Sequence, residues 1–147
     1  MAVIEVTFPS SNLGRAVTFS ALVPVDRNFM PGKGQVFESG KFKTLYLLHG
    51  YTGTHNDFLI NTDIARMSAD YNLAVIFPSG ENSFYLEDEE LGFSHSKFIG
   101  EELVDFTRKL FPLSDRREDT YIAGISMGGY GAMINGLRYA ETFGKIL

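Results

Sequence analysis

The sequence predicts an α/β fold with a mostly parallel sheet. Short runs of apolar, β-prone residues alternate along the chain with segments of helical periodicity. Of the 147 residues, 44% are apolar and 14% are aromatic, which is typical of a globular chain rather than a disordered one. A Gly-x-Ser-x-Gly pentapeptide lies between one of the β-prone runs and a helical segment. A chain of this length is enough for one domain with one core.

Three strands and a loop are predicted before the first helix. Alternating apolar residues at 3–8 and 16–23 indicate strands, and the segment 10–14 indicates the turn that joins them. Residues 26–41 contain one proline and three glycines, which favour a loop. The apolar run at 44–48 predicts a buried third strand.

Helices and strands alternate after the third strand. A helix is expected at 63–69, with Asn61 or Thr62 as its N-terminal cap, before a fourth strand at 73–77. A longer helix is expected at 97–110, because apolar residues recur there at helical spacing on one face: Ile99, Leu103, Phe106 and Leu110.

The pentapeptide Gly-Ile-Ser-Met-Gly at 124–128 predicts a nucleophile elbow, which is a sharp turn between a strand and a helix that exposes a serine. A fifth strand at 121–123 precedes it, a helix over 129–137 follows, and 145–147 would begin a sixth strand. The helix is expected to place its small and apolar residues on one face: Ala132, Met133, Gly136, Leu137 and Ala140.

The residues around Ser126 fit this interpretation. Gly124 and Gly128 flank the serine because a strained turn leaves no room for larger side chains. The helix N-terminus behind Ser126 favours negative charge on a bound oxyanion. The pentapeptide could arise by chance in a chain with 15 glycines, but its position between a strand and a helix favours the functional interpretation.

A second motif, Leu-Leu-His-Gly-Tyr-Thr-Gly at 47–53, follows the third strand. When a nucleophile elbow is present, one oxyanion N–H comes from the residue after the nucleophile and another from the loop after the third strand. We therefore expect the backbone N–H groups of Met127 and Tyr51 to stabilise the negative charge of a tetrahedral intermediate. The alternative, an ordinary glycine turn at the end of a strand, is less favoured because Ser126 is present.

Five segments together resemble a known family. In order and spacing they are similar to the esterase D group of α/β-hydrolases, and most of all to the small bacterial tributyrin esterases. The group also includes S-formylglutathione hydrolases and acetyl-xylan and feruloyl esterases. The segments are Leu-Leu-His-Gly at 47–50, Val-Ile-Phe-Pro-Ser at 75–79, Asn-Ser-Phe-Tyr at 82–85, Gly-Glu-Glu-Leu at 100–103 and Ala-Gly-Ile-Ser-Met-Gly-Gly-Tyr-Gly-Ala at 123–132.

The resemblance implies an α/β-hydrolase fold and a serine carboxylesterase. Short-chain acyl esters would be hydrolysed through an acyl-enzyme on Ser126, with no metal or organic cofactor. The alternatives within enzymes are a carbohydrate esterase that removes acetyl or feruloyl groups and a thioester hydrolase. The competing class is a non-catalytic, hydrolase-like binding module.

The catalytic triad that the resemblance implies is incomplete in this sequence. In α/β-hydrolases its members follow the order Ser, Asp, His along the chain, but no Asp and no His follow Ser126. We therefore expect residues 1–147 to be the N-terminal portion of a single α/β-hydrolase domain, inactive by itself. The missing Asp and His would belong to further C-terminal polypeptide, in the same chain or a separate one.

The three histidines are the candidates to replace the missing base. His49 opens the second motif and is expected to be structural, His55 lies in a polar loop, and His95 lies in a loop or pocket wall before a helix. A base must reach the serine hydroxyl and be oriented by a third group. Nothing in the spacing indicates such an arrangement, so none of them is favoured.

The acidic run 87–90 follows the fourth strand, on the side of the sheet where ligands bind. It could border an acyl or alcohol pocket whose apolar walls are Tyr51, Phe84, Tyr85 and Phe93. The alternatives are a solvated loop for the acidic residues and core packing for the aromatic residues.

Composition excludes several classes of partner. The net charge of −5 argues against nucleic acid and against an anionic membrane surface. The sequence has no cysteine, so it has no disulfide and no thiolate metal site. We see no signal peptide and no apolar run of about 20 residues, so a soluble, cytoplasmic protein is expected. A homo-oligomer is left open.

Overall fold

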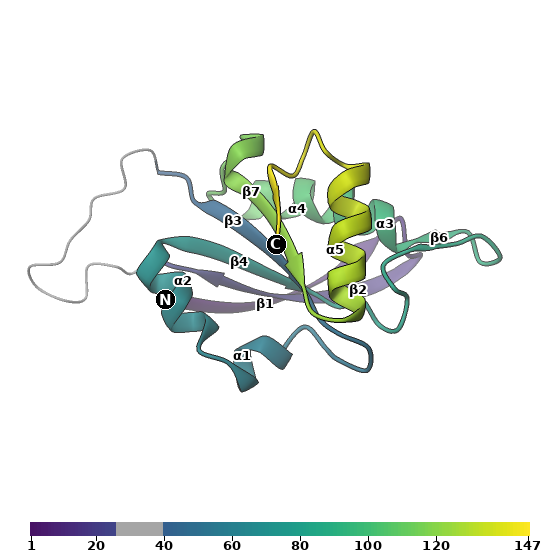
Figure 1. The fold of residues 1–147 in the computed structure, drawn as a ribbon, viewed down its shortest axis with the longest axis horizontal. Helices are drawn as coiled ribbons and strands as arrows, with labels where there is room; N and C mark the ends of the chain where they lie inside the picture. The colour runs from purple at the N-terminus through teal and green to yellow at the C-terminus, as the bar shows by residue number, and fades with distance from the viewer. Residues whose placement is uncertain (26–39) are drawn as a thin grey trace, which may run out of the picture.

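The computed structural model describes residues 1–25 and 40–147, so the loop expected at 26–41 lies almost entirely outside the described residues. These residues form a six-stranded sheet with helices on both faces, and a separate two-stranded hairpin (Figure 1). The predicted α/β fold is confirmed. The strands of the large sheet are β1 Ala2–Ser10, β2 Arg15–Val23, β3 Lys43–Leu48, β4 Leu73–Pro78, β7 Thr120–Gly124 and β8 Lys145–Ile146.

The strand order brings two loops together at one edge of the sheet. The order is β1-β2-β4-β3-β7-β8, with β2 antiparallel to both of its neighbours and with β4, β3, β7 and β8 parallel to one another. Leu48 at the end of β3 lies opposite Gly124 at the end of β7. The loops that follow β3 and β7 therefore start side by side, at the carboxyl edge where ligands bind in parallel sheets.

Alternation along the strands divides the core into two layers. Tyr46 and Ile76 belong to the layer that contains residues of α4 and α5. Leu45 and Val75 point the other way and belong to the layer with α1 and α2. None of the helices of residues 1–25 and 40–147 combines the length and the apolar content that a membrane crossing needs. These helices are α1 Asp57–Asn61, α2 Ile64–Tyr71, α4 Leu103–Leu110 and α5 Met127–Arg138.

The helix predicted at 63–69 is α2, and the prediction of its cap was wrong by one residue. The N-cap residue is Asp63, whose side chain makes no capping hydrogen bond. The N–H of Ile64 instead donates to Thr62 Oγ1 at 3.3 Å. The preceding helix α1 was not predicted, because five residues are too few to show a helical period.

The long helix predicted before the fifth strand is interrupted by a π-helical turn. The structure has α3 at His95–Lys97 and the π-helical η2 at Phe98–Glu102, followed by α4. A π turn closes i to i+5 hydrogen bonds, so the residues after it are rotated relative to an unbroken α-helix. Leu110, which was expected on the buried face, is therefore 48% exposed, and Val104 and Thr107 are buried instead.

Helix α5 packs through small residues, which corrects the predicted face. Ala132 and Gly136 are buried as expected, but Met133 and Leu137 are 47% and 67% exposed, and Ala140 is exposed too. Close packing explains the difference, since a Cβ added to Gly136 would lie 2.5 Å from the Ile146 side chain. The side of α5 that faces the sheet has no room for larger side chains.

Hydrogen bonds to Glu102, the last residue of η2, connect the turn between β1 and β2 to this helical turn. Its carboxylate accepts hydrogen bonds from the hydroxyl groups of Ser10 and Ser11, from the N–H of Ser11 and from the side-chain amide of Asn12. Burial by itself would raise the pKa of this carboxyl group, but the hydrogen bonds outweigh burial and hold the pKa at about 2. The carboxylate is therefore ionised at neutral pH and stabilises the turn in that form.

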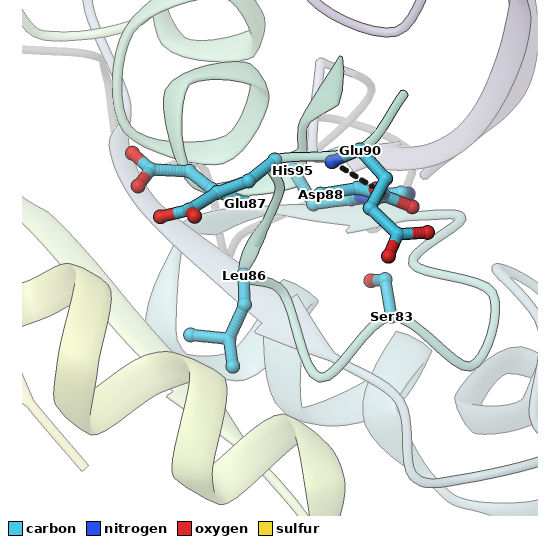
Figure 2. A pocket seen from close by; sticks show the side chains of 7 residues that line it. Ser83, Leu86, Glu87, Asp88, Glu90 and His95 are labelled. Atoms are coloured by element: carbon cyan, nitrogen blue, oxygen red, sulfur yellow. Dashed lines mark hydrogen bonds between the residues drawn. The ribbon is translucent and has the colours of Figure 1, made fainter. Parts of the chain in front are cut away.

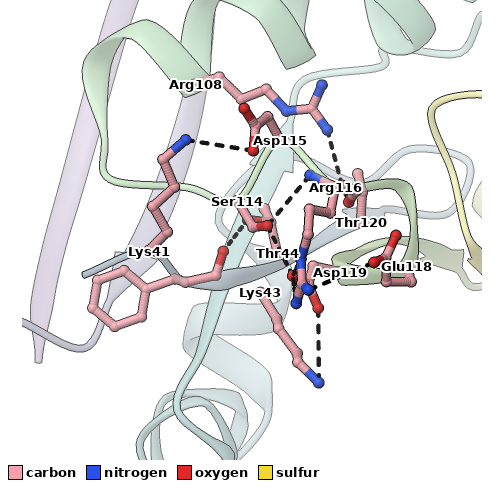
Figure 3. A network of polar contacts seen from close by, with 11 residues as sticks. Lys41, Lys43, Thr44, Arg108, Ser114, Asp115, Arg116, Glu118, Asp119 and Thr120 are labelled. Atoms are coloured by element: carbon pink, nitrogen blue, oxygen red, sulfur yellow. Dashed lines mark hydrogen bonds and ion pairs between the residues drawn. The ribbon is translucent and has the colours of Figure 1, made fainter. Parts of the chain in front are cut away.

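A second polar network joins the first residues of β3 and β7, at the edge of the sheet opposite Ser126 (Figure 3). The buried Asp119 carboxylate accepts hydrogen bonds from Ser114 Oγ and Arg116 Nε, both at 2.8 Å. Arg108 donates to Thr120 Oγ1 at 2.9 Å. Burial raises the pKa of Asp119, but the hydrogen bonds from Ser114 and Arg116 bring it below its ordinary value.

Replacing Glu102 with glutamine is expected to lower the unfolding free energy of the complete protein by about 1–3 kcal/mol at neutral pH, because the charged acceptor is lost. Since the folded pKa lies below the ordinary 4.5, this contribution is complete above that pH and is lost as the pH falls towards 2. Urea denaturation of wild type and variant should show a difference that shrinks on acidification. Glu101→Gln, which alters the exposed neighbouring carboxylate, is the matched control. A difference that stays constant with pH would contradict this role.

Candidate functional site

Ser126 occupies the turn between β7 and α5 in a strained backbone conformation. Its φ and ψ are 55° and −117°, values that non-glycine residues rarely adopt. The turn is held by hydrogen bonds from the N–H of Ile125 to Leu48 O at 3.2 Å and from the N–H of Tyr130 to Ser126 O at 3.0 Å. Strain of this kind persists only where the surrounding structure fixes it, and it concentrates at functional sites. The side chain of Ser126 is exposed.

The two glycines that flank Ser126 are sites of close backbone approach. A Cβ added to Gly128 would lie 2.1 Å from the carbonyl oxygen of Leu48, and one added to Gly124 would lie 2.2 Å from the carbonyl oxygen of Gly128. Only glycine fits at either position without a shift of backbone. The first turn of α5 therefore rests directly on the end of β3.

The loop after β3 runs beside Ser126. A Cβ added to Gly50 would lie 3.6 Å from Ser126 Cβ, so the backbone next to Tyr51 passes close to the serine. Thr52 has a φ of 64°, and its N–H donates to Asn82 Oδ1 at 2.8 Å. In the sequence, Asn82 belongs only to the segment 82–85, and spacing does not predict its contact with this loop.

His49 connects the loops after β3 and β4. Its Nε2 accepts a hydrogen bond from the N–H of Gly80 at 2.8 Å, so its Nδ1 carries the proton and donates to Gly50 O at 2.7 Å. The hydroxyl of Tyr85 donates to His49 O at 3.1 Å. His49 is buried and uses both ring nitrogens, which fits the expected structural role.

His55 also hydrogen-bonds groups other than Ser126. His55 Nδ1 lies 3.0 Å from Ser79 Oγ, and its Nε2 lies 3.0 Å from a Glu5 carboxylate oxygen. In residues 1–25 and 40–147, no histidine hydrogen-bonds Ser126. The same residues contain no cluster of three or more His, Asp or Glu side chains that could hold a metal ion.

Of the four aromatic residues expected as pocket walls, Tyr51 and Phe84 present exposed rings near Ser126. The ring of Phe84 is 44% exposed and lies 6.0 Å from the ring of Tyr51 and 6.2 Å from that of Tyr130. We call Tyr51, Phe84 and Tyr130 the aromatic cluster. Tyr130 follows Ser126 by one helical turn, so the cluster borders the exposed serine.

Tyr85 and Phe93 adopt other positions. Tyr85 is fully buried and packs against Gly80 and Gly131, so it takes the alternative role in the core. Burial raises the pKa of its hydroxyl group. The ring of Phe93 packs over Gly14 in the turn between β1 and β2. The burial of Tyr85 and the contact of Phe93 with Gly14 follow from tertiary packing, which sequence spacing does not reveal.

The acidic run forms part of a hairpin rather than a border of the elbow. β5 Glu87–Asp88 pairs with β6 Phe93–Ser94, and the hairpin projects beyond α3 (Figure 1). Glu87 Oε1 accepts a hydrogen bond from Arg138 at 2.9 Å. Arg138 is the last residue of α5, about 16 Å along the helix from its first turn. The acidic residues therefore lie towards the end of α5 that is distant from Ser126.

Comparison with known proteins gives a consistent family. The model of the Esterase family, described as "Putative esterase", matches residues 10–147. The acetyl esterase of Caldicellulosiruptor saccharolyticus is 46% identical over 147 residues, which cover 100% of this chain and 55% of that relative.

Two solved structures from Staphylococcus aureus share the fold. The fluorophosphonate-binding serine hydrolase FphF is 32% identical with a TM-score of 0.83, over 99% of this chain and 55% of that chain. The S-formylglutathione hydrolase FrmB is 33% identical with a TM-score of 0.80, over 97% of this chain and 54% of that chain. The chain thus spans about half the length of the proteins it matches.

The packing of Gly128 predicts a sharp contrast between two adjacent glycines. Gly128→Ala is expected to destabilise the complete protein by about 3 kcal/mol or more, because the new methyl group meets the Leu48 carbonyl. Gly129→Ala, whose added Cβ would have its nearest contact at 3.3 Å, should stay within about 1 kcal/mol of wild type, since alanine favours the helix. Urea denaturation measures both. Equal effects of the two substitutions would show that the elbow has room that the structure does not show.

Proposed function

This chain belongs to the Esterase family and has the fold of the N-terminal part of an α/β-hydrolase, and from that premise we propose that the protein containing it is a serine carboxylesterase acting on short-chain acyl esters of the tributyrin type. The observation that carries the proposal is the geometry of Ser126. An exposed serine with a φ of 55° lies between a central parallel strand and a glycine-packed helix. That arrangement is the nucleophile elbow.

In this proposal, Ser126 Oγ attacks the ester carbonyl carbon and its proton passes to a histidine. The backbone N–H groups of Tyr51 and Met127 hold the oxyanion. The intermediate collapses to an acyl-enzyme, and the leaving alcohol takes the proton from the histidine. Water then attacks the acyl carbonyl carbon and gives a proton to the histidine. The bond between the acyl group and Ser126 Oγ breaks, the acid leaves, and the histidine passes that proton to Ser126 Oγ. The proximity of the Gly50 backbone to Ser126 supports the pairing of these two N–H groups.

The histidine and the aspartate of the triad would come from further polypeptide, in the same or a separate chain. The engagement of His49 and His55 with other partners supports this assignment. So does the apolar surface of Met133, Leu137 and Ile146, which are 47%, 67% and 39% exposed. Exposed apolar side chains of this kind are suited to pack against other parts of a domain.

The aromatic cluster supports an ester with a small hydrocarbon group. Tyr51, Phe84 and Tyr130 are between 41% and 56% exposed and present apolar surface beside Ser126. Likeness to an acetyl esterase also favours a short acyl group. Acetyl or feruloyl esters of carbohydrates and thioesters are the alternative substrates. The lack of cysteine fits a reducing compartment, and we place the protein in the cytoplasm.

Ser126→Ala in the complete protein is expected to lower kcat for p-nitrophenyl acetate and butyrate by on the order of 10⁵–10⁶-fold and to abolish labelling by a fluorophosphonate probe. Ser79→Ala is the matched control, since Ser79 is a serine that hydrogen-bonds a histidine, His55, and it should keep both activities. Loss of labelling in Ser79→Ala with retention in Ser126→Ala would transfer the nucleophile to Ser79. A wild-type protein that the probe does not label would favour the non-catalytic binding module.

Asn82 is expected to act as a positioning residue for the oxyanion loop, because its side chain accepts the N–H of Thr52, next to Tyr51. Asn82→Ala should lower kcat by about tenfold to a hundredfold with little change in KM, since misplacement of the donor affects the transition state more than the bound ester. Steady-state kinetics on p-nitrophenyl butyrate measure the two constants. Asn61→Ala, at the exposed end of α1, should leave both unchanged. An unaltered kcat in Asn82→Ala would remove Asn82 from this role.

A further inference from the structure

Phe84 lies at the centre of the aromatic cluster. Its ring centroid is 6.0 Å from that of Tyr51 and 6.2 Å from that of Tyr130, so it connects the loop after β3 to the first turn of α5. These are the two segments that flank Ser126. The ring of Phe84 is 44% exposed and therefore presents apolar surface beside the serine.

An unfavourable backbone conformation holds Phe84 in this place. Phe84 and Tyr85 have φ values of 54° and 57°, so two consecutive residues with large side chains are left-handed. Hydrogen bonds support this conformation, from the N–H of Tyr85 to Ser83 Oγ at 3.0 Å and from the N–H of Leu86 to Ser83 O at 3.2 Å. Residues in such conformations persist only where the surrounding structure fixes them, and they concentrate where ligands are held.

Tyr85 fixes the loop to the core. Its ring packs on Gly131, its hydroxyl donates to His49 O at 3.1 Å, and its carbonyl oxygen accepts from Asn135 Nδ2 at 3.2 Å. Tyr85 and Asn135 are fully buried. Because Tyr85 is anchored to both α5 and the end of β3, the backbone presents the ring of the preceding residue, Phe84, on the exposed side.

The neighbours of Phe84 in this loop face a different space. Ser83 and Leu86 line a cavity of about 420 Å³ together with acidic residues of the β5–β6 hairpin (Figure 2). The hairpin is paired with the end of α5 that is distant from Ser126. Within the segment 83–86, Phe84 is therefore the residue whose ring contributes to the surface beside the elbow.

The strand order indicates which part of an ester would reach Phe84. β7, which leads to Ser126, has β3 and β4 on one side and β8 on the other. Tyr51 and Phe84 come from the loops after β3 and β4. On the other side, β8 is the last strand of the sheet in residues 1–25 and 40–147, and the nearby Leu137 and Ile146 are 67% and 39% exposed. In the proposed function, the polypeptide that carries the histidine would pack on that side.

We propose that Phe84 is a specificity-determining residue that binds the acyl chain of the ester, an inference that rests on the proposed function. The leaving oxygen must lie within hydrogen-bond reach of the histidine that protonates it. The acyl chain extends from the carbonyl carbon in the other direction, towards the aromatic cluster. The exposed face of the Phe84 ring contacts the methylene groups of a butyryl chain, whereas an acetyl group is too short to reach it. Phe84 thus favours butyryl over acetyl esters.

Steady-state kinetics of the complete protein on p-nitrophenyl acetate and butyrate test this assignment, because the two esters share a leaving group. In Phe84→Ala, KM for the butyrate should rise about tenfold with kcat unchanged, since the lost apolar contact is made equally in the ground state and the transition state. Hydrolysis of the acetate should change by less than about twofold. Phe84→Leu, which keeps apolar volume, should recover most of the butyrate preference. Tyr71→Ala removes an exposed aromatic ring at the end of α2 and is the matched control, which should leave both esters unchanged.

A second series varies the alcohol at a constant acetyl group. Phe84→Ala should hydrolyse ethyl acetate and butyl acetate with the same activity relative to wild type. A larger loss for butyl acetate would place the ring at the alcohol site and overturn the proposal. An equal fall in kcat for both p-nitrophenyl esters would also overturn it, because the ring would then only stabilise the loop.

The test does not depend on the folding of Phe84→Ala. Tyr130→Ala alters the aromatic cluster from α5 and leaves the residues of the strained loop in place, and it should lower the ratio of butyrate to acetate hydrolysis in the same direction. If the wild type is active and neither Phe84→Ala nor Tyr130→Ala changes this ratio, the inference fails and the proposed function stands. A wild type that hydrolyses none of the four esters would contradict the proposed function and this inference together.

Discussion

Helix α5 approaches the end of β3 so closely that backbone meets backbone, and the site depends on this contact. Gly128 lies against the carbonyl oxygen of Leu48, and Gly124 lies against Gly128. Because the chain must reverse direction within this space, Ser126 is forced into a positive φ. The strain is balanced by the hydrogen bonds of Ile125 and Tyr130 and by burial of Met127. The exposed hydroxyl of Ser126 is the consequence.

The loop after β3 is fixed by the loop after β4 rather than by its own sequence. His49 accepts from Gly80 through one ring nitrogen and donates to Gly50 through the other. Asn82 accepts the N–H of Thr52. The loops that follow the adjacent parallel strands β3 and β4 thus hold each other in place at the carboxyl edge of the sheet. This mutual support explains why a histidine so near Ser126 is not free to act as a base.

The two ends of the sheet differ in how they are stabilised. At the end opposite Ser126, the Asp119 carboxylate is buried among donors and its pKa is lowered by them. At the functional end, the backbone is strained at Ser126, Thr52, Phe84 and Tyr85, all of which have positive φ. Residues with unfavourable backbone conformations need rigid surroundings. The hydrogen-bonded strands of the sheet therefore hold the strained loops that follow them.

The sequence by itself determined the α/β class, the five principal strands, the elbow pentapeptide and the motif after the third strand. The reason is that the spacing of apolar residues and the small size of glycine are local properties of the chain. It did not reveal the π-helical turn at 98–102, the burial of Tyr85 or the position of Phe93 over Gly14. Those features depend on contacts between residues far apart in the chain. The same is true of the partner of Asn82 and of His95 Nε2, which no group of residues 1–25 and 40–147 hydrogen-bonds. Short segments of sequence determine local structure and motifs. The environment of a side chain, in contrast, is set only when the helices pack on the sheet.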